Sequence, residues 1–386
     1  MTWRTITAVL LFQIPTGASS QILPGAGRTE EYLPLLNGKK IAIVANAASV
    51  VNMTNVVDTL LSMNVDIRKI LVPEHGLRIE AEAGQEISGT VDSLTNLPVI
   101  SLYGKKKKPS SEDLDGIDLV VFDLQDVGVR FYTYVSTLSL VMEACAGKGI
   151  PVVVFDRPNP NGFYIDGPVL ETEYASFVGM HPVPMVYGMT IGEYALMVNG
   201  EGWLPDSLKC DLRVIPLDGY THYTPVDLVV KPSPNLTSSN AILLYPSLCL
   251  FEGTVISVGR GTCFPFEVFG HPDLKGFSFY FIPEQIPGMA MDPPYLNRRC
   301  WGLDLRTFYT EKPKLKGRIN ITWLIMSYIN LYNNPDFFTP YFDKLAGNSI
   351  LRKQIMEGKS EHEIRASWQP GLEKFREIRA KYLSYP

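Results

Sequence analysis

The sequence predicts an α/β protein, in which a Rossmann-like, doubly wound parallel sheet is followed by a smaller α+β C-terminal domain. Short apolar runs alternate with helix-like segments from residue 40 to about residue 215. Polar clusters follow several of these runs, whereas aromatic and Pro-rich segments dominate after residue 260. Alternating strands and helices favour a parallel sheet, and ligands of such sheets bind outside the carboxyl ends of the strands.

The expected strands are short apolar runs of the kind that a strand buried on both faces requires. They are residues 40–46, 67–72, 117–122, 151–155, 212–215 and 255–258. Helices are expected between them at residues 54–63, 136–148, 191–199 and 239–250. Thr54 is the expected N-cap of the first helix, and glycines at positions 147 and 149 end the second.

The remainder of the chain is expected to form a second domain. Segments 264–269 and 277–281 are rich in aromatic residues, and helical patterns follow at 321–333, 350–358 and 372–382. We therefore expect a Rossmann-like catalytic domain over residues 21–260 and a C-terminal domain over 261–386 that completes the cleft.

The composition favours a globular enzyme over a protein that binds nucleic acid. The chain has 386 residues, 46% of them hydrophobic, which is enough to bury a sizeable core. Its formal net charge is −5, so it offers no basic surface for a phosphate backbone, and we expect no nucleic-acid partner. The basic run at residues 105–108 is interpreted as a solvated loop.

The N-terminus has the pattern of a secretory signal peptide over residues 1–20. Arg4 precedes an apolar stretch from Ala8 to Ile14, and small residues follow at 17–20. No other apolar stretch approaches membrane length, so we expect a mature chain without a membrane span that is exported to the periplasm or the extracellular space.

Several common catalytic and cofactor motifs are missing from the sequence. The turn after the first strand lacks Gly-x-Gly-x-x-Gly, and there is no Walker loop, Gly-x-Ser-x-Gly or His-Glu-x-x-His. The five cysteines are scattered and form no Cys-x-x-Cys pair. We expect no nucleotide cofactor, no metal site and no disulfide framework.

Glu74 and His75 follow the second strand, between Pro73 and Gly76. A glutamate at such a position is a candidate general acid, and the neighbouring histidine is a candidate for tuning or orienting it. A loop-stabilising hydrogen bond is the alternative role.

Residues 122–134 combine two carboxylates, an arginine and two tyrosines after the third strand. The carboxylates are Asp123 and Asp126, and Arg130, Tyr132 and Tyr134 follow them. Mixed polar and aromatic groups are what a sugar site needs, because a sugar presents apolar ring faces bordered by hydroxyl groups. One of the two aspartates is expected to bind loop N–H groups instead.

Four further polar residues are candidates for the same rim. Asn159 lies in the rigid turn 156–162, where it could order the backbone or bind substrate. Glu193 fits a capping box with Thr190, which makes a structural role the favoured one. Glu252 has no local capping explanation, and Arg260 could bind an anionic substrate group.

The chain resembles the exo-β-N-acetylmuramidase family in a series of segments along nearly its whole length. They are, in order, PEHGLR, LYG, FDLQDVGVRFYTY, DRPNPNG, GPVLE, SFVGMHPVPMVYGMTIGE, LFEGT and GRGT. One departure is Tyr187, where members of that family often carry histidine. This difference argues against a catalytic role for position 187.

The resemblance implies an exo-acting glycoside hydrolase that needs no metal or cofactor. Its substrate would be β-linked N-acetylmuramic acid at the non-reducing end of peptidoglycan-derived muramyl saccharides. Glu74 would be the acid/base, and the second group would be Glu252 itself or the substrate's acetamido oxygen, polarised by Asp123 or Asp126. Arg130 and Arg260 are the candidate partners of the lactyl carboxylate.

Two alternatives belong to other functional classes. A non-catalytic module that binds cell-wall glycan would use the same aromatic and arginine contacts. A Rossmann-like enzyme acting on another sugar or phosphosugar would need a Gly-rich phosphate loop, which the sequence lacks. The residues leave open the stereochemical outcome, the oligomeric state and the tolerance for stem peptides.

Overall fold

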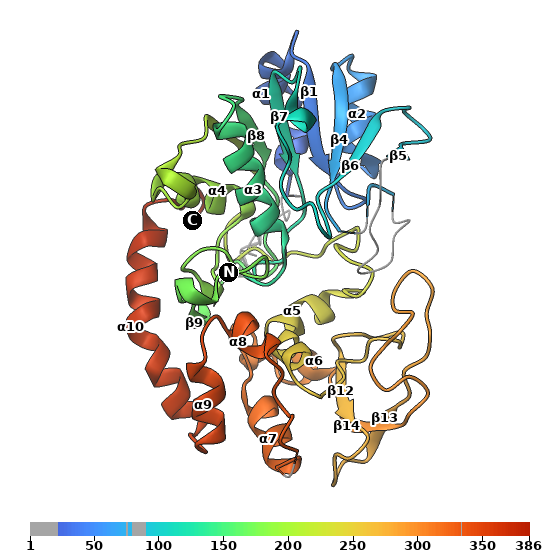
Figure 1. The fold of residues 1–386 in the computed structure, drawn as a ribbon, viewed down its shortest axis with the longest axis vertical. Coiled ribbons are helices and arrows are strands. Elements are labelled where there is room, and N and C mark those ends of the chain that lie inside the picture. Colours follow the sequence, from blue (N-terminus) through green and yellow to red (C-terminus); the bar gives the residue numbers. More distant parts are fainter. Residues whose placement is uncertain (1–21, 75, 79–89, 333) are drawn as a thin grey trace, which may run out of the picture.

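The main feature of the computed structural model is a seven-stranded sheet with the strand order β11-β8-β7-β1-β4-β6-β5 (Figure 1). The structure describes residues 22–386 except 75, 79–89 and 333, so the expected signal peptide lies outside the described residues. Six of the strands run parallel, and only the short edge strand β5 is antiparallel. The predicted α/β class with a parallel sheet is confirmed.

The strand bounds agree closely with the apolar runs of the sequence. The strands are β1 (Ile41–Ala45), β4 (Ile67–Val72), β5 (Thr90–Val91), β6 (Pro98–Ser101), β7 (Leu119–Asp123), β8 (Val152–Phe155) and β11 (Leu212–Ile215). The apolar pattern did not predict β5 and β6, which are short or begin with proline. The expected strand 255–258 was wrong, because this segment forms only an isolated bridge between Ser257 and Gly270.

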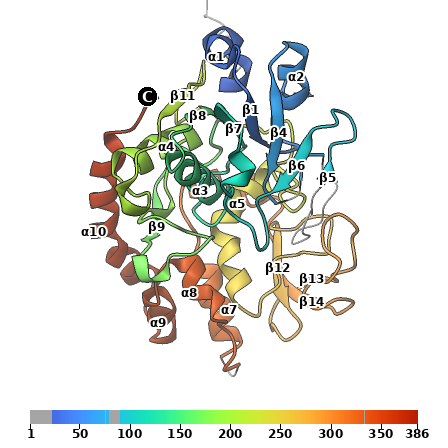
Figure 2. The same ribbon diagram turned by 45° about the horizontal axis from the view of Figure 1, so that its top comes forward.

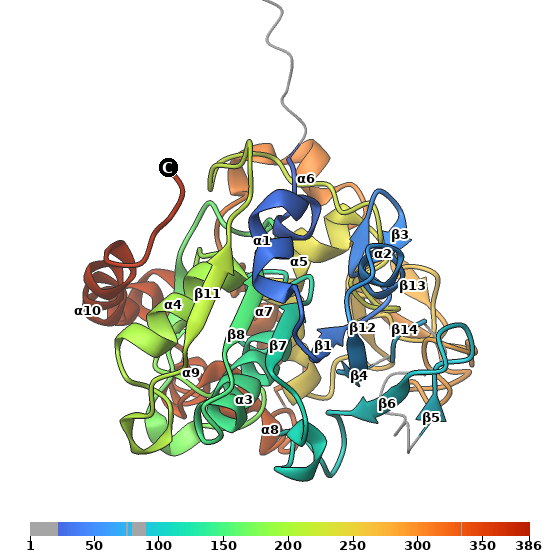
Figure 3. The same ribbon diagram turned by 90° about the horizontal axis from the view of Figure 1, so that it is seen from above.

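Burial on both faces explains why these strands are continuous apolar runs. In β1, Ala42 and Val44 pack into one core, while Ile41, Ile43 and Ala45 pack into the core on the opposite face. Helices cover both faces, as Figure 3 shows from above. They are α1 (Thr29–Leu36), α2 (Val56–Ser62), α3 (Tyr134–Ala146) and α4 (Ile191–Gly200). The sheet is therefore a doubly wound, three-layer structure.

Local sequence signals placed most helix ends within a few residues. The N-cap of α2 is Asn55, whose side chain accepts from the Val57 amide, and not the expected Thr54. Thr190 and Glu193 form the predicted capping box at the start of α4.

The order of the strands places a switch point between β1 and β7. The chain leaves β1 for β4 and β6 on one side, then returns to β7 and continues to β8 and β11 on the other. In nucleotide-binding folds the ligand enters the crevice at this point. Here side chains of the chain occupy it: Asn46 donates to the Tyr134 hydroxyl at 2.8 Å, and Ser49 donates to the backbone oxygen of Asp123.

The C-terminal elements form the expected smaller α+β part, which lies below the main sheet in Figures 1 and 2. It contains a three-stranded antiparallel sheet in the order β12-β14-β13. The strands are β12 (Val268–His271), β13 (Phe279–Phe281) and β14 (Cys300–Asp304). The helices are α5 (Ser239–Leu248), α6 (Phe308–Glu311), α7 (Thr322–Asn330), α8 (Tyr341–Ala346), α9 (Ile350–Met356) and α10 (Glu361–Ala380).

Helix α10 is longer than its apolar pattern predicted. It begins at Glu361 after a Ser360–Glu363 capping box, and Pro370 lies within it. It packs against the two-stranded antiparallel sheet formed by β9 (Asp166–Val169) and β10 (Pro184–Val186). A second small sheet pairs β2 (Val50–Val51) with β3 (Thr54–Asn55).

Among the described residues, no helix is both long enough and apolar enough to cross a membrane. All five cysteines are unpaired, and only Cys263 is exposed.

Candidate active site

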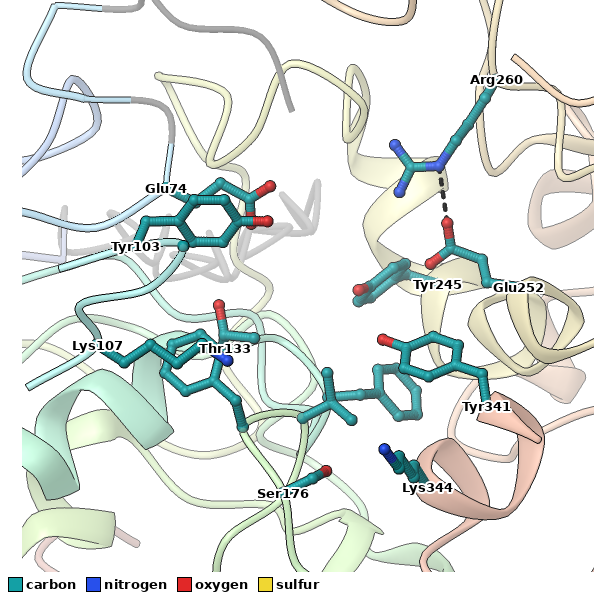
Figure 4. Close-up of a pocket in the computed structure, with 14 residues that line it drawn as sticks. Glu74, Tyr103, Lys107, Thr133, Ser176, Tyr245, Glu252, Arg260, Tyr341 and Lys344 are labelled. Atoms are coloured by element: carbon teal, nitrogen blue, oxygen red, sulfur yellow. Dashed lines mark hydrogen bonds and ion pairs between the residues drawn. The ribbon is translucent and has the colours of Figure 1, made fainter. Parts of the chain in front are cut away.

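A chamber of about 690 Å³ lies where the two parts of the chain meet (Figure 4). Glu74 follows β4, Tyr103 follows β6, and Thr133 ends the loop that follows β7. The opposite wall comes from the C-terminal part and includes Glu252 and Tyr341. The chamber therefore lies at the carboxyl edge of the parallel strands, where ligands bind in this class of fold.

Glu74 lines the chamber directly after the Val72–Pro73 end of β4. Its side chain is half-buried and is hydrogen-bonded with the Tyr103 hydroxyl. Burial, together with the charge and hydrogen bond of Glu74, raises the pKa of Tyr103 to about 12, so the phenol remains a proton donor near neutral pH. Tyr103 therefore orients the Glu74 carboxyl group through this hydrogen bond.

Glu252 faces the chamber from the opposite wall and forms an ion pair with Arg260 (Figure 4). Arg260 Nε donates to Glu252 Oε1 at 2.7 Å, and the guanidinium lies 5.2 Å from the centre of the Phe266 ring. A backbone turn presents Arg260, because Gly261 has a φ of 80° and a side chain there would collide with the Glu284 carbonyl. The pair supplies a fixed anion on the wall opposite Glu74.

A side pocket of about 80 Å³ opens beside Glu74. Tyr132 and Tyr134 line it, and both rings are held in place by hydrogen bonds. The Tyr132 hydroxyl donates to the Pro232 carbonyl at 2.6 Å, and the Tyr134 hydroxyl accepts from Asn46 at 2.8 Å. Asn235 also lines this pocket. Its aromatic walls and its size suit a small group carried by a sugar ring.

Asp123 lies outside the chamber, although it ends β7 as expected. It is buried and accepts two hydrogen bonds from Arg157, at 2.5 Å from Nε and 2.7 Å from Nη2. The guanidinium also donates to the Val50 carbonyl at 3.2 Å. Both carboxylate oxygens are thus engaged within the core, which gives Asp123 a structural role in place of the expected catalytic one.

Asp126 is also buried, in the segment between β7 and α3. Its Oδ2 accepts from the Gly128 amide at 2.6 Å and from the Tyr187 hydroxyl. Burial raises the pKa of Asp126 to about 6. This is the loop-ordering role expected for one of the two aspartates, and it places Tyr187 in the core and away from substrate.

Arg130 was expected to bind the substrate, but its side chain is fully buried and does not reach the chamber. Its guanidinium donates to the backbone carbonyls of Val183 at 2.7 Å, Leu345 at 3.0 Å and Pro168 at 3.1 Å. The residue therefore ties the two parts of the chain together.

Asn159 and Glu193 likewise serve the backbone. Asn159 donates to the Met189 carbonyl at 2.7 Å and accepts from the Asn161 amide at 2.8 Å. Glu193 contacts His222 at 2.8 Å and accepts from the Ser384 amide at 2.7 Å. These contacts match the structural alternatives that the sequence left open. His75 falls outside the described residues, so its role stays a prediction.

Several residues of the chamber were not among the expected site residues. Lys107 belongs to the basic run interpreted as a solvated loop, but it lines the chamber and lies 4.7 Å from the centre of the Phe177 ring. Tyr245, Tyr341 and Lys344 come from helices of the C-terminal part. No motif signal marks these three, because ordinary helical periodicity also produces such residues.

Two models of one protein family together match almost the whole chain. The N-terminal model of the exo-β-N-acetylmuramidase NamZ family matches residues 41–240, and the C-terminal model of the same family matches residues 243–385. The chain belongs to the exo-β-N-acetylmuramidase NamZ family. The junction of the two models precedes the boundary expected at residue 260, so Glu252 and Arg260 fall within the C-terminal NamZ model.

Individual relatives agree with the family assignment. The chain is 39% identical over 375 residues to the peptidoglycan β-N-acetylmuramidase NamZ of Bacillus subtilis, covering 92% of this chain and 89% of that protein. Two crystal structures of DUF1343 family proteins from Bacteroides fragilis share the NamZ fold, with TM-scores of 0.88 and 0.80. Their sequences are 46% and 27% identical to this chain, and each match covers 95% of this chain and 99% of the other.

Proposed function

We propose that the chain is an exo-acting glycoside hydrolase that releases β-linked N-acetylmuramic acid from the non-reducing end of peptidoglycan fragments. The observation that carries this proposal is the pair Glu74 and Glu252, which line one chamber from opposite walls. Glycosidic cleavage needs two such groups, one to protonate the leaving oxygen and one to meet the oxocarbenium-like centre. Family membership and the relative from Bacillus subtilis support the same activity.

Glu74 is the acid/base in this mechanism. It donates its proton to the glycosidic oxygen as the bond to the anomeric carbon breaks and the acetamido oxygen of the substrate bonds to that carbon. Water then opens this cyclic intermediate at the anomeric carbon, and Glu74 accepts the proton of the water. Glu252, which is paired with Arg260, faces the positive charge that develops on the sugar ring.

The first test is turnover of a chromogenic β-N-acetylmuraminide by the wild type and by Glu74→Gln. The substitution keeps the shape of the side chain but removes the transferable proton, so we expect kcat to fall by about 10² to 10⁴. Glu171→Gln, an exposed glutamate outside the chamber, is the matched control and should retain full activity. Near-full activity of Glu74→Gln would end the assignment of Glu74.

The second test concerns stereochemistry. We expect retention, because the 2-acetamido group of the substrate is already placed to attack the anomeric carbon. Proton NMR of the first-formed sugar should therefore show the β-anomer before mutarotation. Initial release of the α-anomer from a β-linked substrate would establish inversion instead.

The same experiments separate this proposal from its two alternatives. A non-catalytic glycan-binding protein would bind muramyl saccharides in calorimetry but release no sugar. An enzyme for a phosphosugar would turn over a phosphorylated substrate in preference to the muraminide.

We further propose that the protein is exported, on the strength of the N-terminal pattern of Arg4, an apolar stretch and small residues. The measurement is fractionation of the native cells with N-terminal sequencing of the recovered protein. Processing near residue 20 supports export, whereas a cytoplasmic protein that retains Met1 or begins at Thr2 contradicts it.

A further inference from the structure

Three cationic side chains line the chamber, and they differ in what already binds them. They are Lys107, Arg260 and Lys344. Arg260 is paired with Glu252 at 2.7 Å, and Lys107 lies over the Phe177 ring at 4.7 Å. The Lys344 side chain has no hydrogen bond, ion pair or ring contact with any residue that the structure describes.

The position of Lys344 suits a group that extends away from the bond to be cleaved. It lies on α8 together with Tyr341, and its ammonium group is directed into the chamber, on the side away from Glu74 (Figure 4). Ser176 lines the neighbouring wall (Figure 4). An anion bound there would lie apart from both carboxylates, so it would not be repelled by the groups that perform the reaction.

Charge balance within the chamber also favours an anionic ligand at this site. Glu252 is paired with Arg260, and the two lysines outnumber the one other carboxylate of the lining, Glu74, so the chamber carries an excess of formal positive charge. Arg130 cannot supply this function, because it is buried and bound to three backbone carbonyls.

We propose that Lys344 binds the lactyl carboxylate of the muramyl residue and thereby selects N-acetylmuramic acid over sugars without that group. This inference rests on the proposed hydrolase function, since it concerns the substrate of the same chamber. The lactyl ether distinguishes N-acetylmuramic acid from N-acetylglucosamine, and its carboxylate is the only charge on the free sugar. A charge-assisted hydrogen bond to a lysine at that point therefore determines specificity.

The experiment compares two muraminides that differ only at the lactyl group, one with a free carboxylate and one with the carboxylate converted to a primary amide. The wild type should prefer the carboxylate substrate by about 10- to 100-fold in kcat/KM, the range expected for one hydrogen bond to a charged group. Lys344→Met should lose this preference by lowering kcat/KM for the carboxylate substrate only. Lys344→Arg, which keeps the charge, should recover part of it.

Lys353→Met is the matched control, since Lys353 is an exposed lysine on α9 outside the chamber. It should keep the preference of the wild type. Equal losses on both substrates in Lys344→Met, or an unchanged preference, would overturn the proposal. A loss confined to substrates that carry a stem peptide would assign Lys344 to a peptide carboxylate and would also overturn it.

A binding measurement separates this inference from the proposed hydrolysis. Calorimetry with free N-acetylmuramic acid and N-acetylglucosamine requires no turnover, and Lys344→Met should weaken only the former. If the wild type hydrolyses neither muraminide but shows this difference in binding, the hydrolase proposal fails and the role of Lys344 stands. If hydrolysis is found but binding of both sugars is unaffected by Lys344→Met, the role of Lys344 fails alone.

Discussion

Acidic side chains at the carboxyl ends of β4 and β7 acquire different roles from their immediate partners. Glu74 meets a phenol at the edge of a chamber, whereas Asp123 meets a guanidinium within the core. Asp126 meets only neutral donors, and its Oδ1 has no hydrogen-bond partner among the described residues. Proximity to a strand end is therefore a weak guide to catalysis unless the partner of each carboxylate is known.

Asp123→Asn tests the structural assignment of the Asp123–Arg157 pair. The substitution leaves a guanidinium buried without its anion, which costs about 3–5 kcal/mol in the free energy of unfolding. We expect a lower denaturation midpoint in urea, while the folded variant turns over substrate at close to the wild-type rate. A drop in turnover rate by a factor of about 100 or more, with unchanged stability, would show that Asp123 is catalytic and would contradict the structural assignment.

The raised pKa of Asp126 predicts a pH dependence of stability with a definite sign. Burial raises this pKa from 3.8 to about 6, so the folded state binds the proton more tightly than the unfolded state. The contribution of the Asp126 carboxyl to the free energy of unfolding is fully present below pH about 3.8 and is lost as the pH rises through about 6. This pKa shift corresponds to roughly 3 kcal/mol in the free energy of unfolding.

Asp126→Asn should therefore reduce the decline in the free energy of unfolding between pH 4 and 6 relative to the wild type. Urea titrations at several pH values measure this difference directly. Asp156, whose pKa burial also raises to about 6, and His181, whose pKa burial lowers to about 4, are present in both proteins and cancel. An exposed aspartate, Asp211→Asn, is the control, and a parallel shift at all pH values would refute the linkage to Asp126.

The C-terminal tail after α10 is anchored to the main sheet by hydrogen bonds. The Tyr385 hydroxyl donates to Asp156 at 2.6 Å and accepts from the Leu217 amide at 2.9 Å. Glu193, at the start of α4, accepts from the Ser384 amide. The tail thus joins the carboxyl end of β8 to the far end of the sequence and fixes α10 against the molecule.

Tyr385→Phe removes one hydroxyl from this anchor and leaves both of its buried partners short of a hydrogen bond. We expect the free energy of unfolding to fall by about 1–3 kcal/mol. Tyr382→Phe is the matched control, because its hydroxyl bonds Glu201 at a less buried site and should cost less than about 1 kcal/mol. Equal effects of the two substitutions in thermal unfolding would show that the tail is not specifically anchored through Tyr385.

The chamber forms where the N-terminal and C-terminal parts of the chain meet. The N-terminal sheet supplies Glu74, Tyr103 and Thr133, while the C-terminal part supplies Glu252 and Lys344. Arg130 joins them by donating to the Leu345 carbonyl on α8. Glu74 and Glu252 are therefore held opposite each other by contacts that join the two parts of the chain.

The unpaired cysteines provide a measurement of the integrity of the whole molecule. Cys263 is exposed, and the other four are buried in the folded chain. Ellman's reagent should therefore titrate one thiol in the native protein and all five in denaturant. Cys263→Ser should abolish the native reaction, and a disulfide between any pair would be revealed by fewer than five thiols in denaturant without reductant.

The apolar pattern was sufficient to predict the α/β class and the positions of β1, β4, β7, β8 and β11, because strands buried on both faces must be continuous apolar runs. The motif segments of the sequence were sufficient to indicate the family. The sequence also pointed to Glu74, Glu252 and Arg260, which the structure brings to one chamber.

Which of the remaining polar residues face that chamber depends on packing between segments that are distant in the sequence. Asp123 and Arg130 lie in the same kind of polar and aromatic segment that a sugar site would use. Asp123 is instead bound by Arg157 and Arg130 by backbone carbonyls, and these partners are distant in the sequence. Lys344 carries no local signal at all, since a lysine on a short helix is normally solvated. Its place in the chamber depends on how α8 packs against the loops of the main sheet, and such long-range packing leaves no mark on the residues beside it.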